Sequence, residues 1–260
     1  MKGKLYRLVI RALNGQRISK ILYTFAHSRV SKPFIKPYAK FYKIDVEEAK
    51  LQMEQFTCLH DFFTRELKKD VRPIDKRENH VISPVDGTIA EYGTISVENE
   101  MIVKNKPYSI TELLGSVERA NQYIGGTYVV IYLSPANYHR IHAPFNGKVL
   151  HTYELGGRSY PVNQHGLKYG DATLAKNYRT ITELKTDTCR YASINVGAMF
   201  VNSIVLTNKD DHWTKGEEVA YFSFGSTVVL LFEKNTFDIN KDLYPQASIK
   251  LGMSIGTCKS

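Results

Sequence analysis

The feature that most constrains this chain is a series of short β-rich runs that begins near residue 80 and is divided by Gly, Pro and Asn. Runs of this kind, rich in Val, Ile, Tyr and Thr and bounded by turn residues, are typical of β-strands. They are YVVIYL, GKVLHTYEL, RTITELKT, CRYASINVGAMFVNSIVL and VVLLFEK. Together they predict a mainly antiparallel β body of the sandwich or barrel type.

The first part of the chain has a different, helical character. KLYRLVIRALNG carries apolar residues at helical spacing, and RISKILYTFAHSRV continues in the same way. Pro33 and Pro37 are expected to break the helices, and VEEAKLQMEQFTCLHDFFTREL again has a helix-friendly composition. The predicted fold class is therefore α+β, with a helical segment at 1–70 and a β-rich domain at 71–260.

One sequence motif occurs twice within the β-rich part. SPVDGTIAEYG (83–93) and APFNGKVLHTYELGG (143–157) share a small residue, Pro, and then Asp-Gly or Asn-Gly before an aliphatic position. Both dipeptides favour tight turns, so each motif predicts a turn that starts a strand. The sequence leaves two interpretations open, which are two independent turns or a duplicated β-unit.

The net charge of +9 is concentrated at one end of the chain. Residues 1–44 contain eleven Lys or Arg and no acid, so the remaining residues carry a net charge of −2. A β body of this charge, without a recognised nucleic-acid motif, argues against nucleic acid as a partner. No run approaches the roughly 18 apolar residues that a spanning helix needs.

The three cysteines are far apart in the sequence. Cys58, Cys189 and Cys258 form no CxxC pair, which argues against a disulfide framework or a zinc site. Such sparse cysteines are typical of a reducing compartment. No metal is therefore expected.

Ser226 interrupts an otherwise apolar strand pattern. In YFSFGSTVVLLFEKN (221–235), Gly225-Ser226-Thr227 falls in the middle, where glycine weakens a strand and a buried hydroxyl needs a partner. The plain interpretation is a small residue at a bulge. A nucleophile elbow is not indicated, because the Gly-x-Ser-x-Gly pattern is missing.

Two histidines and one aspartate are further candidates. His139 and His142 lie in YHRIHAP, where flanking prolines disfavour a helix, so on a strand they would face opposite ways. They suit proton transfer near neutral pH, or they are surface residues of a loop; a metal site would need more ligands nearby. Asp86 before Gly87 is a normal turn residue, or a carboxylate that orients a histidine.

Taken in order, several segments resemble the phosphatidylserine decarboxylase family. These segments together span most of residues 60–234. In chain order they are HDFFTRELKKDVRPI, SPVDGTI, YHRIHAPFNGKV, GGRSYPVN, NVGAMFVNSI and KGEEVAYFSFGSTVVLLFEK. The chain departs from the usual pattern of the family at Leu174, Tyr178, Asn202 and Phe224. None of these departures touches the candidate Asp, His and Ser residues.

The resemblance implies a zymogen that cleaves itself between Gly225 and Ser226. Autocatalytic cleavage would give a β-chain of 1–225 and an α-chain of 226–260 that stay together. Ser226 would become a covalent pyruvoyl group, the only cofactor expected. His142 would act as the general base of this processing step, and Asp86 would hold its tautomer and orientation.

The resemblance also implies a lyase of phospholipid biosynthesis. Phosphatidylserine would form a Schiff base with the pyruvoyl group, lose CO₂ and leave as phosphatidylethanolamine, with His139 assisting decarboxylation or protonation. Two alternatives stay open at this point. One is a lipid-binding β-domain that never processes, and the other is a decarboxylase of a related serine phospholipid.

A lipid substrate gives the basic segment a role. Lys and Arg are attracted to anionic lipid surfaces, and Leu5, Leu8 and Val9 could insert at the interface. The expectation is peripheral binding through residues 1–44 to the cytoplasmic side of the cell membrane. Whether two copies pair as a homodimer is left open.

Overall fold

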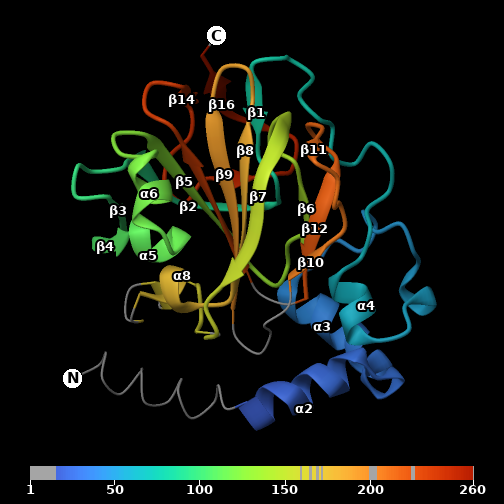
Figure 1. The fold of residues 1–260 in the computed structure, drawn as a ribbon. Helices are drawn as coiled ribbons and strands as arrows, with labels where there is room; N and C mark the ends of the chain where they lie inside the picture. Colours follow the sequence, from blue (N-terminus) through green and yellow to red (C-terminus); the bar gives the residue numbers. More distant parts are fainter. Residues whose placement is uncertain are drawn as a thin grey trace.

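The protein combines a helical N-terminal segment with a curled, mostly antiparallel β body, as the sequence predicts (Figure 1). The structure is a computed structural model that describes residues 16–158, 160–163, 166, 167, 170, 172–198, 204–223 and 226–259. Gly225, Phe224, Asn202 and residues 1–15 therefore lie outside the described residues. The expected boundary near residue 70 falls between the last helix of the N-terminal segment and the first strand.

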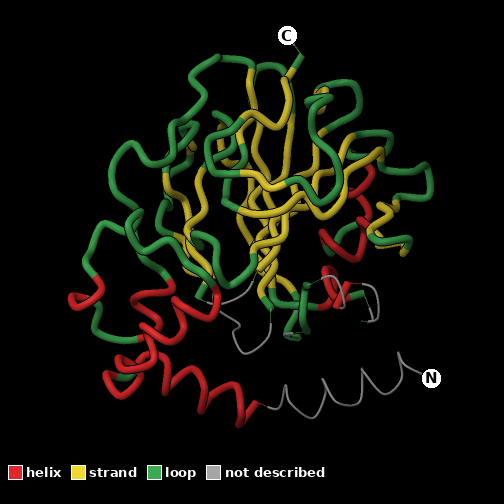
Figure 2. Tube along the Cα trace, turned by 180° about the vertical axis from the view of Figure 1, so that it is seen from behind, coloured by secondary structure: helices red, strands yellow, loops and turns green. Residues whose placement is uncertain are grey.

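The helices are short and fall into two groups. Those of the N-terminal segment are α2 (Gln16–His27), the 3-10 helix η1 (Arg29–Phe34), α3 (Ile35–Tyr42), the 3-10 helix η2 (Met53–Gln55) and α4 (Leu59–Phe63). Those within the β body are α5 (Ile110–Leu114), α6 (Val117–Asn121) and α8 (Thr173–Lys176). Figure 2 shows the first group gathered at one end of the body, while the C-terminus lies at the other end.

Two details of the predicted helices are different in the structure. Pro37 does not break a helix but lies in the first turn of α3, where its missing N–H has no helical partner to lose. Residues 45–58 form only the single turn η2 among the described elements, although their composition suits a helix. Much of this stretch forms turns and bends, and an isolated antiparallel bridge pairs Ala49 with Leu67, so a tertiary contact outweighs helix propensity.

The strands in the described part of the chain form one large sheet and three small ones. The large sheet has the order β11-β7-β8-β9-β13-β5-β2-β15, and the small sheets are β1-β16-β14, β10-β12-β6 and β3-β4. All strand pairs of these sheets are antiparallel. The bounds are β1 (His80–Ile82), β2 (Gly87–Thr94), β3 (Glu100–Val103), β4 (Lys106–Ser109), β5 (Thr127–Leu133), β6 (Arg140–His142), β7 (Gly147–Leu155), β8 (Arg179–Lys185), β9 (Arg190–Gly197), β10 (Ile204–Leu206), β11 (His212–Trp213), β12 (Glu218–Phe222), β13 (Ser226–Phe232), β14 (Phe237–Ile239), β15 (Ser248–Ile249) and β16 (Ser254–Cys258).

Strand β13 is buried along its whole length because both faces of the large sheet are covered. Val228, Leu230 and Phe232 belong to the core that the large sheet shares with the β1 and β12 sheets. Val229 and Leu231 point the other way, into a second core with residues of α5 and of the β3-β4 hairpin. A strand buried on both faces reads as a continuous apolar run, which explains the VVLLF sequence.

The strand orders show that the body is built from two similar units. From its centre the large sheet reads β9-β8-β7-β11 in one direction and β13-β5-β2-β15 in the other. The β6-β12-β10 sheet likewise matches the β1-β16-β14 sheet. In chain order, β1, β2, β5 and β13–β16 form what we call the first repeat, and β6–β12 form the second repeat.

The local pairing supports this correspondence. Gly87 starts β2 opposite Ile249, and Gly147 starts β7 opposite Trp213. In both strands the register shifts two positions after the glycine. The two SPVDG-like motifs are therefore equivalent turns of a duplicated β-unit, which was one of the two open interpretations.

The second repeat is inserted into the first. The chain leaves the first repeat at the end of β5, completes β6–β12, and returns to the first repeat at the start of β13. The stretch 134–139 is the outward crossing, and the stretch from Ser223 to Ser226 is the return crossing. A backbone hydrogen bond of 3.0 Å from the Phe222 N–H to the His139 carbonyl joins the two crossings. The candidate residues His139 and Ser226 therefore meet where the chain passes between the repeats.

Candidate functional site

Ser226 is a fully buried residue at the first position of β13. It is paired with Leu133 of β5 on one side and Gly197 of β9 on the other, so its backbone is fixed from both directions. The bond expected to be cut, Gly225–Ser226, has only its second residue within the described chain.

The side chain next to Ser226 is His139. The Ser226 Oγ lies 3.4 Å from the His139 Nδ1, and His139 is fully buried. The other ring nitrogen, Nε2, lies 3.1 Å from the Ser134 carbonyl oxygen. Because a carbonyl only accepts, Nε2 carries the proton, and the lone pair of Nδ1 faces Ser226. The pair has the arrangement of a hydroxyl and its base.

The surroundings of His139 keep it neutral. Burial and, to a smaller extent, the nearby positive charge of Arg65 lower its pKa from 6.5 to about 3, while the hydrogen bond to Ser134 acts in the opposite direction. The ring of Phe63 from α4 stacks on the imidazole with centroids 3.9 Å apart. Near neutral pH the Nδ1 atom is therefore free of a proton and able to accept one.

Arg65 fixes the loop that carries His139. It is buried, and its guanidinium donates to the carbonyl oxygens of Ala136 and Asn137 at 3.0 and 3.2 Å. The same loop supplies the Ser134 carbonyl that fixes the tautomer of His139. Phe63 and Arg65 were not among the predicted site residues. The only sequence signal for them was their place in the family-like segment HDFFTREL.

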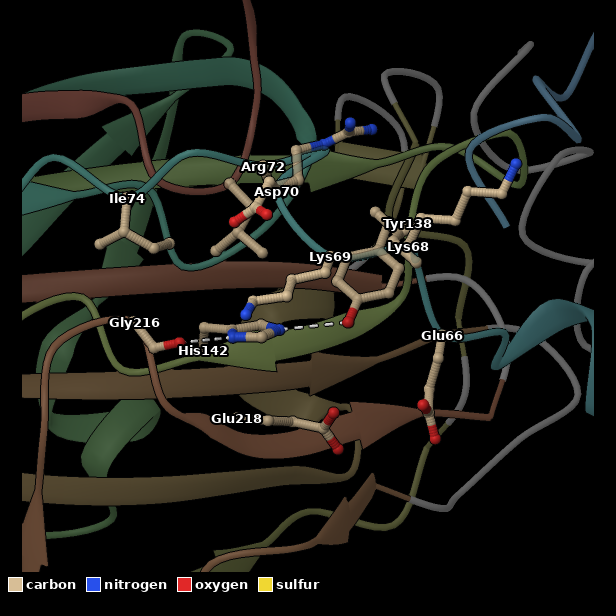
Figure 3. Close-up of a pocket in the computed structure, with 12 residues that line it drawn as sticks. Glu66, Lys68, Lys69, Asp70, Arg72, Ile74, Tyr138, His142, Gly216 and Glu218 are labelled. Atoms are coloured by element: carbon tan, nitrogen blue, oxygen red, sulfur yellow. Dashed lines mark hydrogen bonds between the residues drawn. The ribbon is translucent and has the colours of Figure 1, made fainter. Parts of the chain in front are cut away.

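His142 lies in different surroundings from His139. Its Nδ1 donates to the Gly216 carbonyl at 2.8 Å, and its Nε2 accepts from the Tyr138 hydroxyl at 3.2 Å (Figure 3). Burial lowers the pKa of His142, against the hydrogen bond to Gly216. It has no hydrogen bond to Ser226 in the described part of the chain.

His142 faces a charged pocket of about 400 Å³. Figure 3 shows Lys69 and Glu218 beside it, and Lys68 and Glu66 lie farther along the wall. Ser226 and His139 do not line this pocket. The two histidines of YHRIHAP therefore lie in two separate environments, His142 at the end of β6 and His139 just before this strand begins.

Asp86 is a buried partner of Arg72. Its carboxylate accepts from Nε and Nη2 of Arg72 at 2.9 and 2.6 Å, and from the backbone N–H of Leu251 at 2.8 Å. Glu48 binds the other edge of the same guanidinium. The structure thus brings Ser226 together with His139, and it places Asp86 and His142 in neighbouring but separate networks.

The described residues contain no group of three or more His, Cys, Asp or Glu side chains that could hold a metal ion. The helices of the described chain include none that is long and apolar enough to cross a membrane.

Comparison with known proteins gives a consistent result over nearly the whole chain. Residues 59–257 match the family model for phosphatidylserine decarboxylase. A phosphatidylserine decarboxylase proenzyme of Anoxybacillus flavithermus is 51% identical over 97% of this chain and 95% of its own length. Proenzymes of the same name from Bacillus thuringiensis and a Geobacillus strain are each 48% identical, over 99% and 98% of this chain and 98% of their own lengths. These similarities show that the chain belongs to the phosphatidylserine decarboxylase family.

Proposed function

We propose that this protein is a lyase that converts phosphatidylserine to phosphatidylethanolamine and CO₂ at a centre formed by Ser226 and His139. The observation that carries the proposal is the contact of 3.4 Å between a buried serine hydroxyl and the free nitrogen of a neutral histidine. The names of the relatives, all proenzymes of this activity, support the substrate and the need for processing.

In the proposed processing step, Ser226 is the nucleophile. Its Oγ attacks the carbonyl carbon of Gly225, a C–O bond forms, and the C–N bond to Ser226 breaks. A base takes the hydroxyl proton and returns it to the released nitrogen. β-Elimination then releases the carboxylate of Gly225 and leaves dehydroalanine at position 226. Water replaces the nitrogen of this residue, which leaves as ammonia, and a pyruvoyl group remains at the new end of the 226–260 chain. Ser226 fits this role because β5 and β9 hold the new end in place.

A pyruvoyl carbonyl at this position supplies the electron sink that loss of CO₂ from the serine head group needs. His139 is in the right protonation state to act beside it. Its Nδ1 can accept the proton of the lipid's ammonium group and later give a proton to the carbon that has lost CO₂. Arg65 and Phe63 hold the imidazole in place during these transfers.

The roles of His142 and Asp86 in processing also stay proposals. Support comes from their closeness, since the charge of Asp86 acts to raise the pKa of His142. In the described structure, however, His142 is bonded to Tyr138 and Gly216. His142 would have to turn away from these partners to reach Ser226, whereas His139 already lies beside it.

Intact-mass analysis of the purified protein tests the proposed processing. We expect two chains, divided after residue 225, with a blocked end on the smaller one, and we expect Ser226→Ala to remain one chain of 29.7 kDa. Ser193→Ala makes the same change at a buried serine of the neighbouring β9 and should still be cleaved. An unmodified single chain from the wild type would support a non-processing lipid-binding domain instead.

The two histidines can be separated by measuring cleavage and decarboxylation independently. His139→Ala is expected to lower CO₂ release by about 10²–10⁴-fold, the usual contribution of a general acid–base group. If His142 is the processing base, His142→Ala will accumulate as the uncut chain while His139→Ala is still cut. If His139 serves both steps, His139→Ala will accumulate as the uncut chain while His142→Ala is still cut.

We also propose that the N-terminal segment binds an anionic membrane surface from the cytoplasmic side. Among its described residues, large apolar side chains are exposed beside basic ones. Val30 and Phe41 are 69% and 78% exposed, and Lys20, Arg29 and Lys40 are exposed as well. Apolar side chains next to cations are the composition of an interfacial helix. α2 and α3 lie outside the β body, where such a contact is free to form (Figure 1).

A further inference from the structure

Two of the three cysteines form a close pair. The Sγ atoms of Cys189 and Cys258 lie 3.3 Å apart, and both are buried free thiols. They are distant in the sequence and were not expected to meet. Cys58 lies elsewhere, at the start of α4 in the helical segment.

The pair lies next to the place in the fold that corresponds to the reaction centre, because Arg190 starts β9 as Ser226 starts β13, and Asn79 precedes β1 as His139 precedes β6. The Cys258 N–H donates to the Asn79 carbonyl at 2.9 Å, just as the Phe222 N–H donates to His139 in the other repeat. Cys189 directly precedes β9, as the residue before Ser226 precedes β13. Reactive side chains thus meet in both equivalent regions of the duplicated fold. Ser226 and His139 meet at the start of β13, and Cys189 and Cys258 meet at the start of β9.

The thiol pair has an approach from solvent. A wide pocket of about 640 Å³ is lined by Cys258 together with Asn79, His80 and Lys259. Cys258 forms part of the pocket wall, and the Sγ of Cys189 lies directly behind it, 3.3 Å from the Cys258 Sγ. The Sγ atoms need to approach by only about 1 Å more to reach the bond length of about 2.05 Å of a disulfide.

The pKa values of the two thiols are shifted in opposite directions. The hydrogen bond from the Cys258 thiol lowers the pKa of Cys189, and contact with Thr186 acts in the same direction while burial opposes it. The same hydrogen bond and burial raise the pKa of Cys258. Cys189 is therefore the sulfur that becomes a thiolate, the form that attacks a disulfide.

We propose that Cys189 and Cys258 form a reversible disulfide by exchange with a small-molecule disulfide. The Cys189 thiolate attacks one sulfur of the reagent, forms a mixed disulfide and releases the other half as a thiolate. Cys258 gives up its proton and attacks the Cys189 sulfur, which releases the second half. Two electrons pass from the protein pair to the reagent, and the two protons end on its released thiols.

This bond would add a covalent link between two parts of the molecule that are distant in the sequence. Cys189 lies in the second repeat and Cys258 in the first. Cys189 precedes residue 225 and Cys258 follows it, so in a chain cut after 225 the disulfide would link the two products covalently. Only this last consequence rests on the proposed function, since the pair is present in the intact chain.

The test treats the purified full-length protein with oxidised glutathione, then blocks remaining thiols with N-ethylmaleimide in denaturant and measures masses. Three maleimide additions are possible from the three cysteines, and we expect two fewer after oxidation. Dithiothreitol should restore all of them. Cys189→Ser and Cys258→Ser should each abolish the effect, whereas Cys58→Ser, at another buried cysteine, should retain it.

Several results would overturn the proposal. These are an unchanged number of maleimide additions, a stable glutathione adduct on either cysteine, a disulfide that includes Cys58, or a bond between two molecules. The wild-type measurement decides without any variant, so poor folding of a serine variant does not obscure the result. Ser226→Ala, analysed by peptide mapping, should form the same disulfide within one chain. A failure of processing and a failure of the thiol pair are therefore seen separately.

Discussion

At the scale of single residues, the two histidines of YHRIHAP show what spacing can and cannot predict. Their separation predicts opposite faces if both lie on a strand. Only His142 lies in β6, and the two do have different partners, Ser226 for His139 and the Gly216 carbonyl for His142. It does not say which of them faces Ser226. Which histidine faces Ser226 depends on two contacts between residues that are far apart in the sequence. One is the contact of His139 with Ser226 at the start of β13, and the other is the stacking of Phe63 from α4 on His139. The two histidines could therefore be predicted as a pair, but their separate surroundings could not.

The low pKa of His139 makes stability depend on pH. Its pKa falls from the ordinary value of 6.5 to about 3 on folding, so between these values the unfolded chain holds a proton that the folded chain lacks. The free energy of unfolding should therefore decrease as the pH falls through this window, by about 1.4 kcal/mol per pH unit from this group. Urea unfolding of the wild type and of His139→Gln at several pH values measures the difference. Parallel pH profiles for the two proteins would contradict the assignment.

Arg65 contributes to that low pKa, and its charge can be separated from its packing. Arg65→Met removes the positive charge, so the pKa of His139 should rise, whereas Arg65→Lys keeps the charge and should change it less. Titration of the labelled imidazole by NMR reports the pKa directly. If both variants shift it equally, then the guanidinium acts through its bonds to the loop rather than through charge.

At the scale of elements, the strands were the most predictable part of the chain. The β-rich runs coincide with β5, β7, β8, β9 and β13, because alternating or continuous apolar patterns depend on burial within each strand. Their order in the large sheet could not be predicted, since it depends on the insertion of one repeat into the other. The composition of residues 45–58 favours a helix, but the stretch forms turns and the bridge between Ala49 and Leu67, which local composition does not predict.

The equivalent glycines Gly87 and Gly147 should tolerate substitution unequally. A Cβ on Gly87 would lie 2.6 Å from the Tyr132 carbonyl oxygen, a backbone atom that cannot easily move. On Gly147 the nearest atom would be 3.3 Å away. Gly87→Ala should therefore lower the free energy of unfolding by about 1–3 kcal/mol, the usual cost of overpacking, and Gly147→Ala by less. Thermal or urea unfolding measures the free energy of unfolding of both variants. An equal decrease would show that the strands around Gly87 move to make room for the added Cβ.

At the scale of the whole molecule, the uneven charge predicts how the protein meets a lipid surface. Each exposed cation contributes about 1 kcal/mol of attraction to an anionic membrane before screening. Replacing Lys20, Arg29 and Lys40 with Gln should thus weaken binding to phosphatidylserine vesicles by about two orders of magnitude at low salt, and by less at high salt. Vesicle sedimentation measures this.

A matched control replaces three lysines of the opposite, C-terminal half, Lys209, Lys241 and Lys259, which are all exposed. This variant has the same net charge as the first and should bind vesicles nearly as well as the wild type. Equal losses in the two variants would mean that net charge, and not the basic segment, attracts the membrane.

The duplicated architecture has a consequence for the lifetime of a cut molecule. The 226–260 piece contributes β13 to the centre of the large sheet, between β9 and β5, and β16 to the middle of a small sheet. It could not leave as a ligand leaves a surface, because its departure would open both sheets and expose unpaired edges. Its escape rate should therefore equal the rate at which the whole body unfolds, and dilution alone should not release it. The two pieces would behave as a kinetically trapped fold rather than as a complex with a dissociation constant.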